Sequence, residues 1–569
     1  MTLEDTMLDC VIRGGMLIDG TGAARRQADI GIKDGRIAAI GTVTEAARET
    51  IDATGKVVAP GFIDVHTHYD AQIMWDPALT PSSLHGVTTV LGGNCGFTIA
   101  PIAPSSADYV IQMLATVEGM PVESLREGLN ITWSGFGDWL DLLDGKVGLN
   151  VGFLAGHSTI RRLVMGDDWR RAATEAEIAT MRALVDQSVS EGALGFSSSW
   201  GHAHADHQGN PVPSRFAEHG ELVELASTLR DHPGTMLEFI AGSQPFFPQA
   251  SIDVMVAMSK AAQKPLNWNV LSIGTGIGDD AIKQRLDASD YAATQGAKVV
   301  ALVLPIPQIV RITMNFLGFN ILPEWRAFLA HPREHVVHGM ADPATRAMLM
   351  QDVEENGRRH VFDFANFLVE NVTNPELTSL EGRVLSDIAA GRGVTPVEAF
   401  LDIQLADELR AVFKTGAAAD EGPLWEKRRA LWNDPRTLLG ASDAGAHLDS
   451  LDSFVLYSEF VGPVVRRGLI SLEDAVHKIT DAPARFYGLR ERGRIETGWH
   501  ADIVVFDADT IASHPLTMRK DMPGGQSRLF AGADGVDHVL VAGTTVSRRG
   551  ELTGALPGTV LRSGRDTGE

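Results

Sequence analysis

The chain has 569 residues and a formal charge of −24, from 73 acidic and 49 basic side chains. A surface this acidic repels phosphate backbones and anionic lipid headgroups, so nucleic-acid and membrane partners are disfavoured. With 44% hydrophobic and 21% charged residues, the composition is that of a globular protein with a sizeable core, and the length predicts a large domain accompanied by something smaller.

The first residues, MTLEDTMLDC, are acidic and lack the basic and apolar segments of a secretory signal. No apolar run approaches the roughly 20 residues that a membrane helix requires. The chain has only two cysteines, Cys10 and Cys95, far apart in sequence. A disulfide framework is therefore not expected, and a reducing compartment is the simpler interpretation. We expect a cytoplasmic protein.

Short strands with tight turns are predicted near both ends of the chain. Residues 8–58 contain two Asp-Gly turn signals between apolar runs. Residues 493–509 and 536–552 likewise have short apolar runs next to turn residues. Because neither segment can bury a core alone, we predict that residues 1–58 and 490–569 form one small β-sandwich domain. The alternative is two independent flaps.

Eight apolar, strand-like runs lie between these ends. They are VVAPGFIDVHTH (57–68), VTTVLGGNCGF (87–97), VGLNVGFLAGHSTI (147–160), ALGFSSSW (193–200), TMLEFIAG (235–242), PLNWNVLS (265–272), KVVALVLP (298–305) and TLLGASDAGAH (437–447). Helical patterns, with apolar residues three and four positions apart, separate several of them, as in residues 174–192 and 251–264. Apolar strands joined by helices favour parallel pairing with both faces buried, and eight of them close a (β/α)8 barrel. The sequence therefore predicts an α/β fold in which residues 59–489 form a TIM-like barrel.

The regular spacing breaks before the last strand. Residues 306–436 form a long interval with several helical patterns. An insertion after the carboxyl end of a barrel strand lies over the active site. We therefore predict a mostly helical cap that supplies part of the substrate pocket.

Polar side chains gather at the carboxyl ends of the predicted strands, where the loops of a barrel converge on one mouth. In chain order they are His66, His68, Asp70, Cys95, His157, Ser198, Ser199, Glu238, Asn269, Asp443 and His447. Side chains alternate along an extended strand, so the imidazoles of His66 and His68 can both reach one ion. This concentration of ligand types predicts a metallohydrolase-type metal site.

Four segments resemble the amidohydrolase superfamily, specifically its D-aminoacylase (N-acyl-D-amino-acid deacylase) branch. They are VVAPGFIDVHTHYD, GVTTVLGGNCGF, ASDAGAH and HKITDAPARFYGLRERGRIETGWHADIVVFD. The resemblance covers nearly the whole chain and implies a divalent metal, usually zinc, that activates a water to attack an amide carbonyl. Carried over by position, His66 and His68 would be ligands and Cys95 a thiolate ligand, either of one ion or bridging two. The alternative for Cys95 is an ordinary buried cysteine. Asp443 would touch the metal and take the proton of the water.

The fifth and sixth strands depart from the family, which places a histidine ligand on each. Here they read TMLEFIAG and PLNWNVLS, without histidine. Glu238 is the nearest carboxylate and is expected as an additional metal ligand, whereas Asn269, a poor zinc ligand, is expected to bind substrate. The number of bound ions, one or two, is then left open. A larger share of oxygen ligands would favour a harder metal such as manganese. A chain without metal is the remaining alternative.

Other polar residues near the predicted mouth are candidates for substrate contact. His157 ends the third strand and is expected to contact substrate or support a ligand. The segment WGHAHADHQGNPVPSR contains His202, His204 and His207, which suggest either a second metal or a flexible loop. His202 and Arg215 are expected to contact substrate.

Together these observations predict a metal-dependent hydrolase of linear, non-peptide amides that deacylates an N-acyl-D-amino acid or a related N-acyl amine. A cyclic amide or imide, a carbamate or an ester is the alternative on the same barrel, because one fold hosts many chemistries. An alternative outside the enzymes is a scaffold that binds a ligand without catalysing a reaction. The expected partner is a small-molecule substrate, with no nucleic acid and no membrane, and a homo-oligomer is left open.

Overall fold

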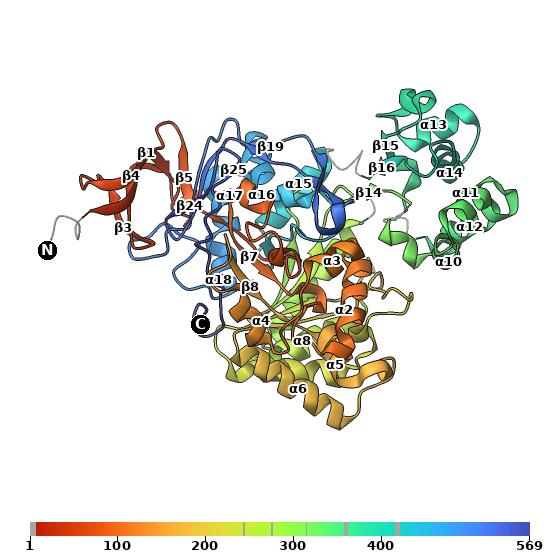
Figure 1. Ribbon diagram of the computed structural model, residues 1–569, viewed down its shortest axis with the longest axis horizontal. Coiled ribbons are helices and arrows are strands. Elements are labelled where there is room, and N and C mark those ends of the chain that lie inside the picture. Colours follow the sequence, from red (N-terminus) through yellow and green to blue (C-terminus); the bar gives the residue numbers. More distant parts are fainter. Residues whose placement is uncertain are drawn as a thin grey trace.

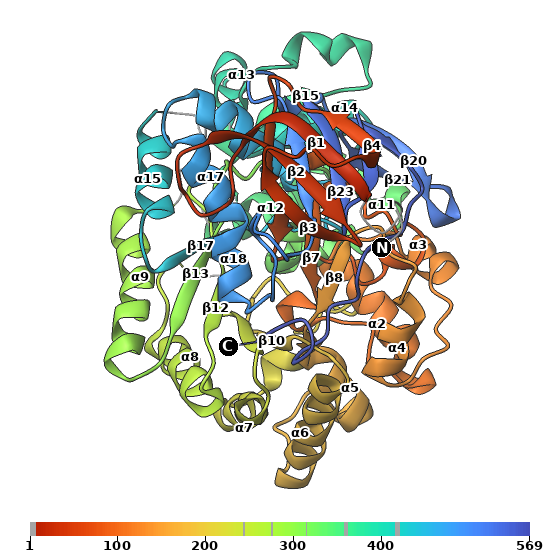
Figure 2. The ribbon, with the colours of Figure 1, turned by 90° about the vertical axis from the view of Figure 1, so that its left-hand side faces the viewer.

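The computed structural model describes residues 7–242, 245–274, 277–314, 316–357, 362–415 and 422–568. At its centre lies a ring of eight parallel strands, several of which are labelled in Figure 2. They are β6 (Phe62–Asp64), β7 (Val87–Gly92), β8 (Asn150–Phe153) continued by β9 (Ala155–Gly156), β10 (Gly195–Ser199), β11 (Met236–Ile240), β12 (Leu266–Leu271), β13 (Val299–Val303) and β17 (Thr437–Leu439). Neighbouring strands pair in parallel, and Thr67 closes the ring through a parallel bridge to Ala444. The predicted (β/α)8 barrel is confirmed.

Helices surround the ring, and local sequence fixes where they begin. They include α6 (Glu175–Ser190), α7 (His219–Ser227), α8 (Gln249–Ala262), α9 (Asp279–Thr294), α15 (Gly422–Trp432) and α17 (Leu472–Ile479). Helix α6 starts at a capping box, in which the Thr174 hydroxyl accepts the Glu177 N–H at 3.3 Å and the Glu177 carboxylate accepts the Thr174 N–H at 2.8 Å. The strands between these helices are buried on both faces, so polar side chains concentrate at the strand ends.

Both chain ends contribute to a second sheet, which lies on the left in Figure 1. Its nine strands are β1 (Leu8–Leu17), β2 (Arg26–Lys33), β3 (Arg36–Gly41), β4 (Ala47–Asp52), β5 (Val57–Pro60), β18 (Ile503–Phe506), β23 (Val536–Val541), β24 (Thr544–Arg548) and β25 (Glu551–Leu552). The antiparallel pairing of β5 with β18 joins the two ends of the chain. Ile12, Ile30 and Ile503 are among the fully buried residues of its core.

Two segments near the end of the chain leave this sheet and contact the barrel. Strands β20 (Thr517–Met522) and β21 (Gln526–Phe530) form a hairpin that reaches the barrel mouth, where the Leu529 N–H donates to the Leu448 carbonyl at 2.7 Å. Later, Val560 forms a parallel bridge with Val151 of β8. The assignment of residues 490–569 to one small domain stays a prediction, and within that range these segments lie on the barrel.

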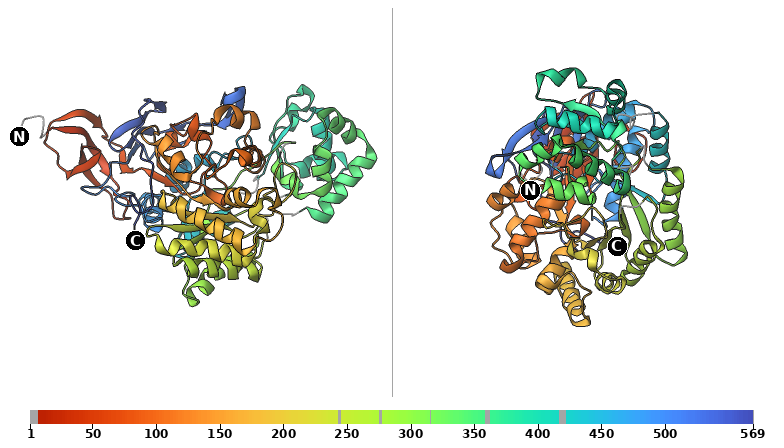
Figure 3. Two further views of the ribbon diagram at one scale, coloured as in Figure 1. Left: turned by 60° about the horizontal axis from the view of Figure 1, so that its bottom comes forward. Right: turned by 90° about the vertical axis from the view of Figure 1, so that its right-hand side faces the viewer.

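The long interval before β17 has a hydrophobic core of its own and projects from the barrel (Figure 3). Its helices are α10 (Pro323–Leu329), α11 (Arg333–Ala341), α12 (Pro343–Asn356), α13 (Leu385–Arg392) and α14 (Pro396–Ala406). A small antiparallel sheet of β14 (Arg311–Ile312), β15 (Leu368–Asn371) and β16 (Val412–Lys414) accompanies them. The last helix of the interval, α15, packs on the barrel instead, through Leu424, Trp425, Leu431 and Trp432.

Within the parts of the chain that the structure describes, no helix combines the length and the apolar character needed to cross a bilayer.

Candidate metal centre

The two histidines that follow β6 point into the mouth of the barrel from one strand. His66 and His68 are buried, at 4% and 2% exposure. The His68 N–H donates to the Ala444 carbonyl at 2.8 Å, and the His66 carbonyl accepts the Asp443 N–H at 3.1 Å. These backbone bonds fix the segment that carries the two histidines against the loop after β17. The side chains of His66, His68 and Asp443 therefore have defined relative positions.

Cys95 and Asp443 complete the group from two loops. Cys95 lies in a short 3-10 turn, η3 (Asn94–Gly96), with a φ of 58°. The turn needs Gly93 beside it, since a Cβ there would lie 2.2 Å from the Leu154 carbonyl oxygen. Asp443 also has a φ of 58°, a left-handed conformation that aspartate tolerates better than most residues.

The donor atoms of His66, His68 and Cys95 lie within 4.8 Å of one another, and an Asp443 oxygen lies beside both imidazoles. The Cys95 Sγ lies 3.5 Å from the His66 Nε2 and 3.7 Å from the His68 Nε2. The Asp443 Oδ1 lies 3.4 Å and 3.2 Å from the same two nitrogens. Ligands at zinc bond lengths in a tetrahedral shell are separated by about 3.3–3.6 Å. The two imidazoles and the thiol have a spacing that fits a single zinc-type ion, and the Asp443 carboxylate lies beside both imidazoles.

Electrostatics also favour a cation at this point. Burial raises the pKa of the Cys95 thiol and of the Glu118 carboxyl well above their usual values, and nearby carboxylates add to both shifts. Burial likewise raises the pKa of Glu238 to about 8 and that of Asp70 to about 7. For Asp443, burial acts in the same direction, but hydrogen bonds from the two histidines outweigh it and lower the pKa well below its usual value. A divalent cation would offset the repulsion among these groups.

Glu118 is a member of the site that sequence reasoning missed. It follows helix α2 (Pro104–Val117), is 2% exposed, and places its Oε1 3.5 Å from the Nδ1 of His68. Its backbone carbonyl accepts the His447 N–H at 2.5 Å. A carboxylate at the second nitrogen of a ligand histidine orients the ring and raises its basicity. Glu118 follows a helix rather than a barrel strand, so the strand-end rule gave no signal for it.

Replacing Glu118 by glutamine should weaken zinc affinity by about 10–100-fold, because His68 loses the negative charge behind it. Competition with a chromophoric chelator measures this affinity. Glu123→Gln, an exposed carboxylate on α3 (Val122–Gly128), is the matched control and should leave the affinity unchanged. An unaltered affinity in Glu118→Gln would remove the role assigned to Glu118.

Glu238 and Asn269 bind each other and stand beside the four-residue group. Glu238 is fully buried, and its Oε2 accepts the backbone N–H of Cys95 at 3.0 Å. Its Oε1 accepts a hydrogen bond from the side-chain amide of Asn269. The structure thus places Glu238 next to Cys95 with both oxygens engaged by nitrogen donors, and it places Asn269 against Glu238.

His157 lies in a buried cluster where no substrate can touch it. Its Nδ1 is 2.8 Å from the Ser198 hydroxyl, and its Nε2 is 2.9 Å from the Glu221 Oε1. Arg161 donates to the same carboxylate oxygen at 2.9 Å. His157, Ser198 and Arg161 are 0% exposed, so the predicted substrate contact of His157 lacks an accessible surface and the cluster supports the fold.

Glu221→Gln should lower the free energy of unfolding by about 3–5 kcal/mol, because the Arg161 guanidinium stays buried without its counter-charge. Denaturant unfolding followed by circular dichroism measures the loss. Glu224→Gln on the same helix is the control, since that side chain is 57% exposed and forms only a 3.8 Å surface pair; a change below about 1 kcal/mol is expected there. Equal effects in the two variants would contradict the buried-pair interpretation.

The histidine-rich loop after β10 is ordered by contacts within itself. The Arg215 guanidinium donates to the carbonyls of His202 and His204, at 3.1 and 3.3 Å, and the His204 Nδ1 lies 2.8 Å from the Ser199 hydroxyl. Across the described ranges, the one group of His, Cys, Asp and Glu side chains close enough to hold an ion is His66, His68 and Cys95. The alternative of a second metal in this loop therefore has no support from the geometry.

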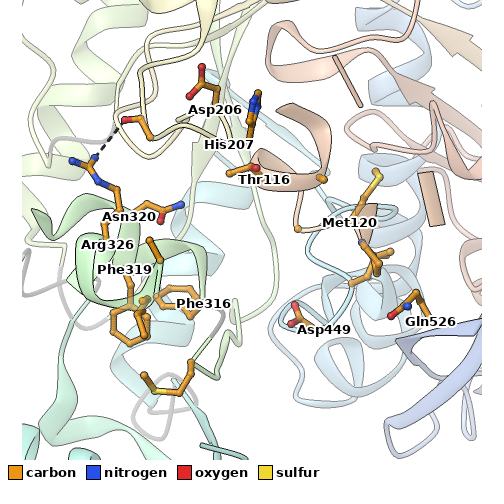
Figure 4. A pocket seen from close by; sticks show the side chains of 18 of the residues that line it. Thr116, Met120, Asp206, His207, Phe316, Phe319, Asn320, Arg326, Asp449 and Gln526 are labelled. Atoms are coloured by element: carbon orange, nitrogen blue, oxygen red, sulfur yellow. Dashed lines mark hydrogen bonds between the residues drawn. The ribbon is translucent and has the colours of Figure 1, made fainter. Parts of the chain in front are cut away.

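A cavity of about 950 Å³ adjoins the centre, between the barrel mouth and the insertion. Figure 4 shows Phe316, Phe319 and Arg326 of the insertion on one side, and Met120 and Asp449 on the other. The cavity reaches the site through the immediate neighbours of Glu118 and His447. The Asp443 side chain keeps 23% of its surface exposed.

Comparisons with known proteins agree on one group of enzymes. The model of the family described as "Amidohydrolase family" matches residues 49–547. D-aminoacylase of Alcaligenes xylosoxydans xylosoxydans is 30% identical, over 97% of this chain and 97% of that protein. The structure of an N-acyl-D-glutamate deacylase of Bordetella bronchiseptica, in complex with zinc and a phosphonate inhibitor, has a TM-score of 0.64 and 26% identity, over 98% of this chain and 100% of that one. A D-aminoacylase structure described with a binuclear metal centre has a TM-score of 0.65 and 26% identity over the same shares.

Proposed function

The chain belongs to the amidohydrolase family and hydrolyses carbon–nitrogen bonds other than peptide bonds, and from this premise we propose that it deacylates an N-acyl-D-amino acid or a related N-acyl amine. The observation that carries the proposal is the convergence of His66, His68 and Cys95, whose donor atoms lie within 4.8 Å of one another in the mouth of the barrel, with the Asp443 Oδ1 beside both imidazole nitrogens. The substrates named for the D-aminoacylase and N-acyl-D-glutamate deacylase relatives support the choice of bond.

These four side chains would hold the divalent metal ion of the enzyme. When bound, such an ion lowers the pKa of a coordinated water towards neutrality and polarises a carbonyl. A thiol and two imidazoles favour zinc over harder metals. Manganese prefers oxygen ligands, whereas the group of mutually close donors consists of two imidazoles and a thiol, so we propose zinc. A thiolate ligand also requires a reduced Cys95, which supports a cytoplasmic location.

Asp443 is the residue placed to move the proton. Its Oδ1 faces His66 and His68, while its Oδ2 faces the Nε2 of His447 at 3.9 Å. One oxygen can thus stay with the ligand group while the other accepts a proton from the attacking water and returns it to the leaving nitrogen. His447, which is 22% exposed at the same edge, lies where it can contact the reacting group.

The cavity supports a substrate larger than the scissile bond alone. Phe316, Phe319 and Met120 offer apolar surface for an acyl chain, and Arg326 offers a cationic group for a carboxylate. A volume near 950 Å³ is at the upper end of small-molecule pockets. The amide carbonyl would then lie at the mouth, with the two ends of the substrate in the cavity.

A substrate panel with product masses tests the proposed reaction. Metal-loaded protein is incubated with N-acyl-D- and N-acyl-L-amino acids, cyclic imides and esters. Release of a free D-amino acid and a carboxylic acid is expected. Turnover restricted to cyclic imides, seen as a gain of one water without a released fragment, would replace the proposed substrate, and absence of turnover across the panel would refute it.

A further inference from the structure

Glu238, at the centre of β11, accepts a hydrogen bond on each of its oxygens. Its Oε2 accepts the Cys95 N–H at 3.0 Å, and its Oε1 accepts the side-chain N–H of Asn269. The residue is 0% exposed. A buried carboxylate with a donor on each oxygen is held in place by the protein, while each oxygen keeps a second lone pair.

Hydrogen bonds continue from Asn269 to Asn267 on the same strand and from there to Tyr487. The side-chain amide of Asn267 donates to the Asn269 Oδ1 at 2.7 Å, and the Tyr487 hydroxyl donates to the Asn267 Oδ1 at 3.2 Å. Asn267 and Asn269 alternate on β12, so both project to the same side of the strand. All four side chains are buried. The tyrosine–amide–carboxylate network, consisting of Tyr487, Asn267, Asn269 and Glu238, therefore ends on the amide nitrogen of Cys95.

This network contains few groups that can bind a second ion. The amide nitrogens of Asn267 and Asn269 donate hydrogen bonds and have no lone pair for a metal. Protein zinc sites use three or four side-chain ligands. In the described part of the chain, the only group of three close His, Cys, Asp or Glu side chains is His66, His68 and Cys95, and Asp443 joins it through its Oδ1.

We infer that the centre of this chain holds one ion, and that the tyrosine–amide–carboxylate network takes the place of a second by positioning Cys95. The inference rests on the proposed function, which places an ion on His66, His68, Cys95 and Asp443. The D-aminoacylase structure is described with a binuclear centre in which one metal activates and the second attenuates.

Cys95 needs such support because of its backbone. Its φ of 58° lies in the left-handed region. A residue other than glycine adopts this backbone conformation only where its surroundings stabilise it. The Glu238 carboxylate satisfies the buried N–H of this residue, and the Asn269 amide holds the carboxylate in turn. Glu238 and Asn269 are thus positioning residues that direct the Cys95 sulfur to the ion.

Metal titration of the full chain tests the stoichiometry. Apoprotein is titrated with cobalt(II), whose thiolate complex gives a near-ultraviolet charge-transfer band, and the zinc form is analysed by plasma mass spectrometry. The band should saturate at one equivalent, with one zinc per chain. Two ions per chain would overturn this inference alone, whereas active protein without any ion would refute the proposed function itself.

Asn269→Asp tests the network by gain of a site, because it places a second carboxylate beside Glu238 and Cys95. This variant should bind two ions per chain. Asn433→Asp, at an exposed position, is the control for the same chemical change and should keep one. Binding of one ion by folded Asn269→Asp would contradict the role of the network.

Glu238→Gln gives a second, independent readout. Here one oxygen is replaced by a donor that opposes the Cys95 N–H or the Asn269 amide. The cobalt band should shift and the affinity for the single ion should fall by about 10–100-fold, with stoichiometry unchanged. A band and affinity equal to those of the unmodified chain would show that Glu238 does not position Cys95. Circular dichroism establishes that each variant is folded.

Discussion

Replacement of Asp443 by asparagine is expected to lower kcat by about 10²–10⁴-fold while the chain keeps its metal ion. Asparagine preserves the size of the side chain and one oxygen, but its amide cannot accept the proton of the attacking water. His66, His68 and Cys95 remain as ligands, since their nitrogen and sulfur donors still meet at separations of 3.5 and 3.7 Å. Steady-state kinetics together with metal analysis of the same preparation separate loss of chemistry from loss of the ion.

The control for this prediction is a carboxylate at the edge of the same cavity. Asp449→Asn removes a charge near the mouth without touching the four-residue group, so its effect should fall on KM rather than on kcat. If Asp443→Asn instead keeps a kcat close to that of the unmodified enzyme, Asp443 does not transfer the proton, and a different base must be sought.

Replacement of His66 by alanine is expected to empty the site and to lower activity by about 10⁴-fold or more, because the metal supplies both water activation and carbonyl polarisation. The remaining donors, His68, Cys95 and Asp443, would leave one corner of the shell open, and burial disfavours the charged form of Cys95 by raising the pKa of its thiol. Equilibrium dialysis against zinc measures occupancy, and the substrate panel measures turnover.

His338→Ala is the matched control for this second variant. His338 is exposed on α11, where its Nδ1 lies 2.6 Å from the carbonyl oxygen of Glu334. Zinc content and activity should both be retained. A His66→Ala protein that retained zinc with the affinity of the unmodified chain would remove His66 from the ligand set.

Much of the site follows from strand geometry in the sequence. His66 and His68 alternate after an apolar strand, and Asp443 follows the last strand, so parallel pairing around a closed ring brings them together. Glu118 lies outside this logic, because it follows a helix and approaches His68 only through the fold of the loop between β7 and β8.

Contacts between non-adjacent elements explain the other differences. The bond from Cys95 to Glu238 joins the loop after β7 to β11, and no local pattern encodes that pairing. Glu238 was therefore expected to face an ion, whereas the structure gives both of its oxygens to nitrogen donors. The small sheet of the insertion has strands of two to four residues, too short for an alternating pattern to predict.

One measurement tests the metal site most directly: anomalous diffraction at the zinc edge from crystals of fully active protein. A single peak within bonding distance of His66, His68, Cys95 and Asp443 is the predicted result. A barrel mouth without any peak, in protein that still turns over substrate, would contradict the account.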